Sequence, residues 1–494
     1  MHNKAKNFNS QWMIFLLLFS LTHLAATNND LRLVETVERG DSESVRFLLQ
    51  QQVDVNQSQP DGTTSLHWAA HRDDVQMVDL LINAGGNVNV SNQYGVTPLS
   101  LACTNGSPTI VERLLHAGAN ANATQKTGET VLMTASRSGN IQVVNLLLAH
   151  GANVNRSETR RGQTALMWAV EQQHADIARV LIEHGTDSHA ESHSGFTPLL
   201  FAAQQGSFDS IQILLTAGGV DVNETSPRWG SALVTAAARG HEQLALFLLN
   251  QGADPNATDG NGISALHYSL LRGLAVIANA PEHLATNNHL YRPNMRELTK
   301  ALLTHGADPN SRIKNETHIQ GGGGVRVTMA GATPLLLAST AADKDLVHLL
   351  IKNGADPELG TYKGVTPLMG AAGLAHKMDR PSKEEYKNAL EITQFLVQEG
   401  ANVNAIGENG WTALHGAAYI GADETIRFLV DSNAKLDIVD VFLQTPWSIA
   451  EGIIGAGIVN FNKKPSGPHP SASRLLLELG SDPMAVPELP KKYR

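Results

Sequence analysis

The stretch Thr64-Ser65-Leu66-His67-Trp68-Ala69-Ala70 decides the fold, because variants of it recur through the 494-residue chain at a nearly fixed interval. The leucine of this phrase marks the interval, with most steps being 33 or 34 residues: Leu66, Leu99, Leu132, Leu166, Leu199, Leu233, Leu266, Leu335, Leu368 and Leu414. A second apolar pair usually follows 14 or 15 residues later, as at Leu80-Leu81. A period of this length is typical of stacked supersecondary units, so each unit is predicted to hold two short helices.

The residues around each leucine have local physical roles. In Gly95-Val96-Thr97-Pro98-Leu99, the glycine supplies a turn, Thr97 can cap a helix, and Pro98 suits the first helical position. Small pairs such as Ala69-Ala70 let neighbouring helices approach closely. The second helix ends at a glycine, as in Gly151-Ala152-Asn153-Val154-Asn155, where a left-handed residue is favoured.

This pattern closely resembles the ankyrin repeat. Residues 64–70 and 412–418 are similar to its opening phrase, and residues 252–256 and 306–310 are similar to its closing Gly-Ala-Asp-x-Asn. The resemblance implies an all-α ankyrin-repeat solenoid of paired antiparallel helices with β-hairpin loops, with about 12 repeats over residues 30–483. Terminal units cap such stacks, and residues 484–494 are expected to form a C-terminal tail.

Four insertions break the period, near residues 274–296, 312–330, 374–388 and 452–470. Helix spacing places the first, third and fourth in equivalent turns between the two helices of a repeat, which predicts that they project from one edge of the solenoid. The second, which contains Gly321 to Gly324, lies between repeats. Lengthening a surface loop costs little, so the insertions are either tolerated additions or a second contact surface.

The first 27 residues are predicted to be a secretory signal peptide. Lys4 and Lys6 precede an apolar run that begins at Met13 and continues, with interruptions, to Ala26. The run is shorter than the roughly 20 residues of a membrane-spanning helix. We therefore expect an exported protein, periplasmic or secreted, with no stable membrane insertion after cleavage; an uncleaved N-terminal anchor is the alternative. The architecture looks like that of multi-ankyrin proteins exported by bacteria.

Composition excludes several chemistries. The formal net charge of −10 disfavours nucleic acid as a partner, because phosphate binding needs a basic face. Cys103 is the single cysteine, so an intrachain disulfide and a cysteine-based zinc site are excluded, and its place in the small-residue pair predicts burial. The Asn-x-Ser/Thr sequons are either glycosylation acceptors or by-products of asparagine-rich hairpins; they include Asn56, Asn105, Asn122, Asn155, Asn223, Asn256 and Asn315.

No catalytic or metal site is predicted. His67 occupies the histidine of the repeat phrase, where the resemblance implies a structural hydrogen bond, and His184 closes a second helix, where imidazole suits the C-terminus. The chain has neither a Gly-x-Ser-x-Gly nor a phosphate-binding loop motif. We expect no cofactor and no enzyme activity; convergence of polar residues from the insertions on a pocket is the competing hypothesis.

The predicted function is a protein-binding scaffold. Ankyrin proteins are similar to one another in binding through hairpin tips and the concave face of the first helices. Mapping those positions here gives ten candidate partner-binding residues: Tyr94, Lys126, Arg137, Arg160, Arg161, His193, Phe196, Arg228, Trp229 and Arg239. Arginine and aromatic side chains dominate binding hot spots, and the cations favour a protein partner with an acidic surface.

Two alternatives stay open. Trp229 could pack between hairpins while the arginines only solubilise them. The chain could also be a stabilising accessory subunit of one exported enzyme.

Overall fold

The computed structural model describes residues 30–270, 293–315, 330–374, 382–407, 409–452 and 468–485. The chain divides into two compact units, Met1–Ser194 and Gly195–Arg494, which we call unit one and unit two. The predicted signal peptide, part of each insertion and residues 486–494 lie outside the described residues. No helix within the described ranges has the length and apolar character needed to cross a membrane.

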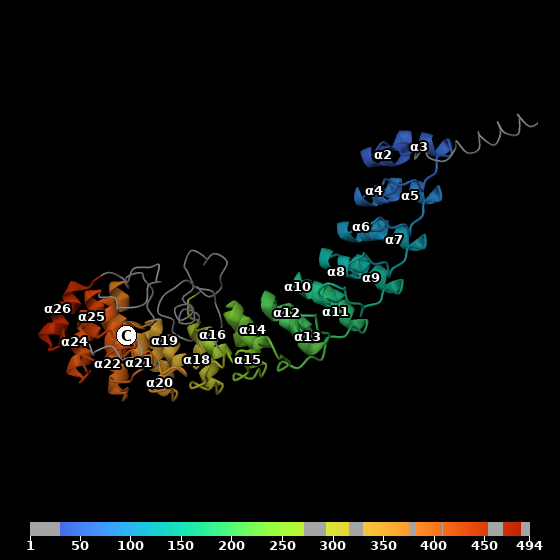
Figure 1. Cartoon of the computed structure of the whole chain (residues 1–494). Coiled ribbons are helices and arrows are strands. Elements are labelled where there is room, and N and C mark those ends of the chain that lie inside the picture. The colour runs from blue at the N-terminus through green and yellow to red at the C-terminus, as the bar shows by residue number, and fades with distance from the viewer. Residues whose placement is uncertain are drawn as a thin grey trace, which may run out of the picture. The chain divides into compact units, whose positions relative to one another are not determined.

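Unit one is a stack of helix pairs (Figure 1). The first helices of the pairs are α2 (Arg32–Arg39), α4 (Ser65–His71), α6 (Pro98–Asn105), α8 (Val131–Ser138) and α10 (Ala165–Glu171). The second helices are α3 (Ser42–Gln50), α5 (Val75–Asn83), α7 (Pro108–His116), α9 (Ile141–Ala149) and α11 (Ala175–Glu183). From α2 to α10, first helices pack on first helices, and from α5 to α11, second helices pack on second helices.

Unit two repeats the arrangement. Its first helices are α12 (Pro198–Gln205), α14 (Ala232–Arg239), α16 (Ala265–Ser269), α19 (Pro334–Thr340), α21 (Pro367–Met369), α23 (Ala413–Ile420) and α25 (Pro446–Glu451). Its second helices are α13 (Phe208–Thr216), α15 (Glu242–Asn250), α18 (Arg296–Thr304), α20 (Lys344–Lys352), α22 (Lys383–Gln398), α24 (Asp423–Asp431) and α26 (Pro470–Glu478). A π-helical turn, η3 (Gly370–Leu374), continues α21.

The helix pairs confirm the all-α ankyrin-type solenoid. The β-hairpins between repeats are minimal in the described residues: β1 (Thr225–Ser226) pairs antiparallel with β2 (Gly230–Ser231). Other hairpins reach only one bridge, such as that between Ser58 and Thr64.

Local capping explains where each helix begins and ends. At α6, the Thr97 hydroxyl accepts a hydrogen bond from the Ser100 amide at 3.2 Å, and Pro98 occupies the first turn. The helix ends at Gly106, whose φ of 65° is left-handed. Leu99 is 1% exposed, and burying one such leucine contributes roughly 1.5–3 kcal/mol.

The histidine of the repeat phrase completes the cap, as predicted for His67. Its Nδ1 accepts from the Thr64 amide at 3.1 Å, so the ring proton is on Nε2, which donates to the Val96 carbonyl at 2.9 Å. His267 and His415 make the same bonds to their own N-caps and to the next hairpin. Each imidazole thus joins two repeats and is held neutral inside the stack.

A ladder of asparagines also joins the repeats. Asn122 donates from Nδ2 to the Gly151 carbonyl at 2.9 Å, and its Oδ1 accepts from the Asn153 amide at 2.8 Å. The same paired bonds recur at Asn56, Asn89, Asn155, Asn223, Asn256, Asn310 and Asn404.

This ladder accounts for most of the sequons. Six sequon asparagines belong to it, and Asn89, followed by Ser91, is one of them. At the other five, the Ser or Thr two residues later forms the hairpin bridge or strand pair: Asn56, Asn122, Asn155, Asn223 and Asn256. The Asn-x-Ser/Thr spacing therefore has a structural origin at these positions.

We predict that Asn122→Ala destabilises the protein by about 1–2 kcal/mol, because the substitution removes two hydrogen bonds that join successive repeats. Urea unfolding followed by tryptophan fluorescence measures the change. Asn83→Ala, at an exposed position of α5, is the matched control and should change stability by less than about 0.5 kcal/mol. Equal effects of the two substitutions would contradict the assigned role of the ladder.

The described ends of two insertions show how the repeat absorbs them. Residues 383–388 form the first turns of α22, which begins with a capping box between Ser382 and Glu385. The described part of the insertion near 374–388 therefore lengthens a second helix. The insertion near 312–330 leaves from a hairpin, whose base is closed by the Gly331 amide donating to the Ile313 carbonyl at 2.7 Å.

Candidate protein-binding surface

In unit one, backbone hydrogen bonds align the hairpin tips in a row. The Lys126 amide donates to the Tyr94 carbonyl at 3.1 Å, the Thr159 amide to the Thr127 carbonyl at 2.9 Å, and the His193 amide to the Arg161 carbonyl at 2.8 Å. Consecutive tips are thereby held in register across successive repeats. Five of the predicted partner-binding residues lie on this row, which we call the unit-one tip row: Tyr94, Lys126, Arg160, Arg161 and His193.

A buried carboxylate shapes the tip that presents the two arginines. Glu158 is 5% exposed, and its oxygens accept from the amides of Arg160 at 2.6 Å and Arg161 at 2.7 Å. Both arginine side chains are exposed, and neither has an ion-pair partner in the described part of the chain. Tyr94, 60% exposed, adds an aromatic surface to the same row. The row is therefore a rigid backbone with outward cations and one aromatic ring.

Arg137 lies behind the tips on the first-helix face. Its guanidinium is 4.7 Å from the centroid of the Trp168 ring, one repeat further along the chain, and 3.4 Å from Glu129. A cation over an indole contributes about 0.5–1 kcal/mol at an exposed site. The indole N–H of Trp168 is buried and has no acceptor among the described residues. Arg137 therefore covers an aromatic side chain and presents its own charge at the surface.

In unit two, the structure corrects the exposed position expected for Phe196. Its side chain is 7% exposed and packs 5.2 Å from Phe201 and 4.9 Å from Trp229, measured between ring centroids. Trp229 is half-buried, and the Arg228 guanidinium lies 4.7 Å from the centre of its ring. This geometry favours the alternative in which Trp229 packs between hairpins. Arg228 is exposed, and Arg239 is half-buried in the last turn of α14.

Sequence reasoning missed several exposed apolar residues of unit two. Ile406 and Val441 are 56% and 58% exposed near hairpin tips. Trp411 follows the tip glycine of its hairpin and has the signature of an exposed tip, but it is 5% exposed and donates from Nε1 to Asp440 at 2.8 Å. Phe196 and Trp411 both directly follow a tip glycine and both are buried, so that position is the signal that could have predicted their burial.

Cys103 and the histidines that close the second helices are held in structural roles. Cys103 is fully buried, as predicted, and burial raises the pKa of its thiol well above the usual range. His184 bonds through Nδ1 to the Val180 carbonyl of its own helix at 2.8 Å, as His150 and His305 do in theirs. Within the described ranges, no group of three or more His, Cys, Asp or Glu side chains could hold a metal ion.

These features define a helical-repeat protein that presents an extended surface. A model of three ankyrin repeats matches residues 33–125, 105–192, 132–226, 199–280 and 385–450, and a single-repeat model matches residues 330–362. These matches cover more than half of the chain. The chain belongs to the ankyrin-repeat family.

Its similarity to curated proteins is limited to short stretches. An ankyrin repeat protein of Acanthamoeba polyphaga mimivirus is 30% identical over 120 residues, which are 22% of this chain and 21% of that protein. The B-cell lymphoma 3 protein homolog of Mus musculus is 32% identical over 120 residues, 24% of each chain. Protein phosphatase 1 regulatory subunit 12A of Mus musculus is 39% identical over 70 residues, 14% of this chain and 7% of that subunit.

The chain thus spans less than a quarter of each of these relatives, which are viral and mammalian. The resemblance to exported bacterial multi-ankyrin proteins stays a prediction.

Proposed function

We propose that this protein is a non-enzymatic scaffold that binds another protein through the unit-one tip row and the adjoining first-helix face. The observation that supports the proposal most is the alignment of Tyr94, Lys126, Arg160 and Arg161 on consecutive, backbone-linked tips. A surface of this kind is preorganised, so a partner pays little ordering cost on binding. The unpaired cations favour a partner with an acidic surface, and they predict an association rate that falls with salt.

The proposed compartment is an exported one, periplasmic or secreted, on the strength of the N-terminal pattern in residues 1–27. N-terminal sequencing of the protein from its native cells tests this, since a start near residue 27 supports cleavage and an intact Met1 supports an anchor. The alternative function, a stabilising subunit of one exported enzyme, predicts constitutive co-purification with that enzyme.

We expect the double substitution Arg160→Glu and Arg161→Glu to weaken partner binding at least 100-fold, because it puts two carboxylates where an acidic surface docks. The first measurement is an affinity pull-down from the native cell envelope at low and moderately high salt, followed by titration calorimetry with the captured partner. Arg228→Glu, made separately, tests the exposed cation of unit two.

Arg46→Glu with Arg179→Glu is the matched control, because it makes the same change in charge on exposed positions of the second helices. This control should keep the affinity within about twofold, and both variants should keep the thermal midpoint. Unchanged affinity in the tip variant, or equal loss in both variants, would remove the tip row from the binding surface.

A further inference from the structure

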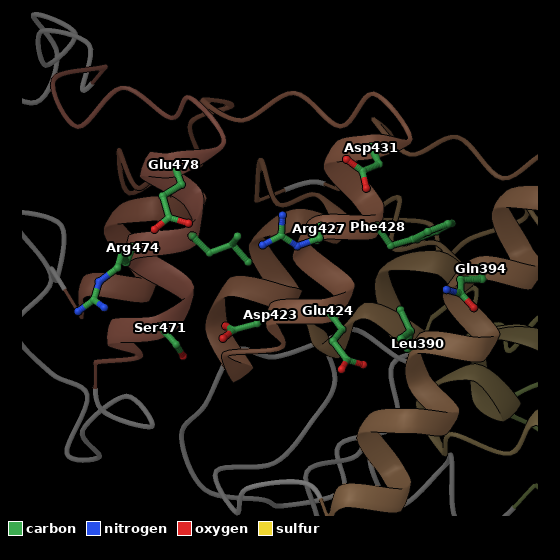
Figure 2. Close-up of a pocket in the computed structure, with 11 residues that line it drawn as sticks. Leu390, Gln394, Asp423, Glu424, Arg427, Phe428, Asp431, Ser471, Arg474 and Glu478 are labelled. Carbon is green, nitrogen blue, oxygen red and sulfur yellow. The ribbon is translucent and has the colours of Figure 1, made fainter.

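A groove crosses the second-helix layer at the end of unit two (Figure 2). It is formed by α22, α24 and α26 and encloses about 670 Å³. Leu390, Phe428 and Leu475 supply its apolar surface. Because second helices alone line it, this second-helix groove is separate from the hairpin tips and first helices that the proposed function uses.

The groove has an excess of negative charge. Four carboxylates line it, from Asp423, Glu424, Asp431 and Glu478, against the two guanidinium groups of Arg427 and Arg474, which leaves a formal charge of −2. None of these six side chains forms an ion pair with another described residue. A cationic ligand would therefore meet carboxylates that have no competing partner within the described chain.

One of these carboxylates is already partly removed from water. The Oδ1 atom of Asp423 is buried and receives no hydrogen bond from the described residues. Asp423 and Arg427 both extend from α24 toward α26, into the groove (Figure 2). A buried acceptor without a donor is unfavourable, so a donor that enters the groove beside Asp423 would satisfy it.

We propose that the second-helix groove binds residues 486–494 of the same chain. This segment contains Lys491, Lys492 and Arg494, which complement the four carboxylates, and Leu489 and Tyr493, which suit the apolar surface. The chain leaves α26 at Glu478, beside the groove, and is described up to Ala485. Nine further residues span up to about 30 Å when extended, which reaches along the groove.

Residues 486–494 are favoured over a segment of another protein, because the chain itself joins them to α26 beside the groove. A segment joined by a short linker has an effective concentration of the order of millimolar at its site, so a modest intrinsic affinity is enough to keep it bound. The docked segment would cover the apolar surface between the second helices of the last repeats and would protect the end of the stack.

The test compares the full chain with a chain ending at Ala485, using a synthetic peptide of residues 486–494 and a scrambled peptide of the same composition. The shortened chain retains every described helix, and circular dichroism checks its folding. In titration calorimetry, we expect the shortened chain to bind the native-order peptide at least tenfold more tightly than the full chain does, because the full chain supplies its own competitor.

Substitutions locate the binding site on the shortened chain. Asp423→Asn with Glu478→Gln should weaken peptide binding at least tenfold. Asp209→Asn with Glu297→Gln, which removes two exposed carboxylates from other second helices, should leave binding within twofold.

The proposal is overturned if the shortened chain fails to bind the peptide or if the groove and control variants bind it equally. It is also overturned if the full chain binds as tightly as the shortened one, a result that would show a groove open to a basic segment from another protein. None of these outcomes bears on the tip row.

Discussion

Lowering the pH from 7 to 4.5 will destabilise this protein strongly, because its capping histidines must stay neutral in the fold. Burial lowers the pKa of His267 and of His415 to about 4, and it also lowers the pKa of His67. An unfolded histidine binds its proton near pH 6.5. Between these values the unfolded state binds more protons, so the free energy of unfolding falls as the pH falls.

The stability that depends on these histidines staying neutral is fully present above pH 6.5, and it is lost as the pH falls toward 4. Each of His267 and His415 contributes up to roughly 3 kcal/mol to the free energy of unfolding, because one unit of pKa shift corresponds to about 1.36 kcal/mol. Urea unfolding at a series of pH values measures the slope.

A variant without the titrating rings separates this effect from that of the carboxylates. His267→Gln with His415→Gln keeps a side chain that can accept from the N-cap amide, as glutamine does in a capping box. We expect this variant to be less stable than the wild type at pH 7.5 and to lose about 4 kcal/mol less between pH 7 and 4.5. Parallel slopes for the two proteins would show that the histidines do not control acid unfolding.

Gly95→Ala is expected to cost about 3 kcal/mol, because the added methyl group would meet the backbone of the next hairpin. Gly95 has a φ of +80°, and an added Cβ would lie 2.9 Å from the Lys126 amide nitrogen and 3.0 Å from the Gln125 Cα. Those atoms belong to the backbone of the next hairpin, so they cannot yield without breaking the bond between the Lys126 amide and the Tyr94 carbonyl. Left-handed strain adds about 1–2 kcal/mol to the clash.

Gly151→Ala is the control for backbone strain alone. Gly151 has a φ of +81°, but no atom lies within 4 Å of an added Cβ. This substitution should cost about 1 kcal/mol, measured by the same unfolding experiment. If the two substitutions destabilise equally, the close approach of neighbouring tips does not contribute. The close approach at Gly95 lets the Lys126 amide bond to the Tyr94 carbonyl and so keeps these two tips aligned. The substitution should therefore also weaken partner binding.

Much of the fold could be predicted from the sequence because its determinants are local. The bonds that start a helix join residues three apart, such as Thr97 and Ser100, and a left-handed cap needs a glycine such as Gly106. Repetition of these signals fixed the length and order of the repeats, and the position of Cys103 in the phrase was enough to predict its burial.

The candidate surface was less predictable, because side-chain exposure depends on the neighbouring repeat. The sequence places both Phe196 and Trp229 at hairpin tips, yet their rings pack against each other, which buries Phe196 and half-buries Trp229. Arg137 and Trp168 are likewise one repeat apart in sequence and in contact in space.

The sequence by itself determined the class of fold, the register of its repeats and the types of residue at each tip. The tertiary structure alone decided which tips align through backbone bonds, which aromatic rings they bury, and that α22, α24 and α26 leave a charged groove between them. The physical reason is the range of the interactions. Capping and turn formation act within a few residues, whereas burial and charge pairing are set by side chains that a full repeat of chain separates.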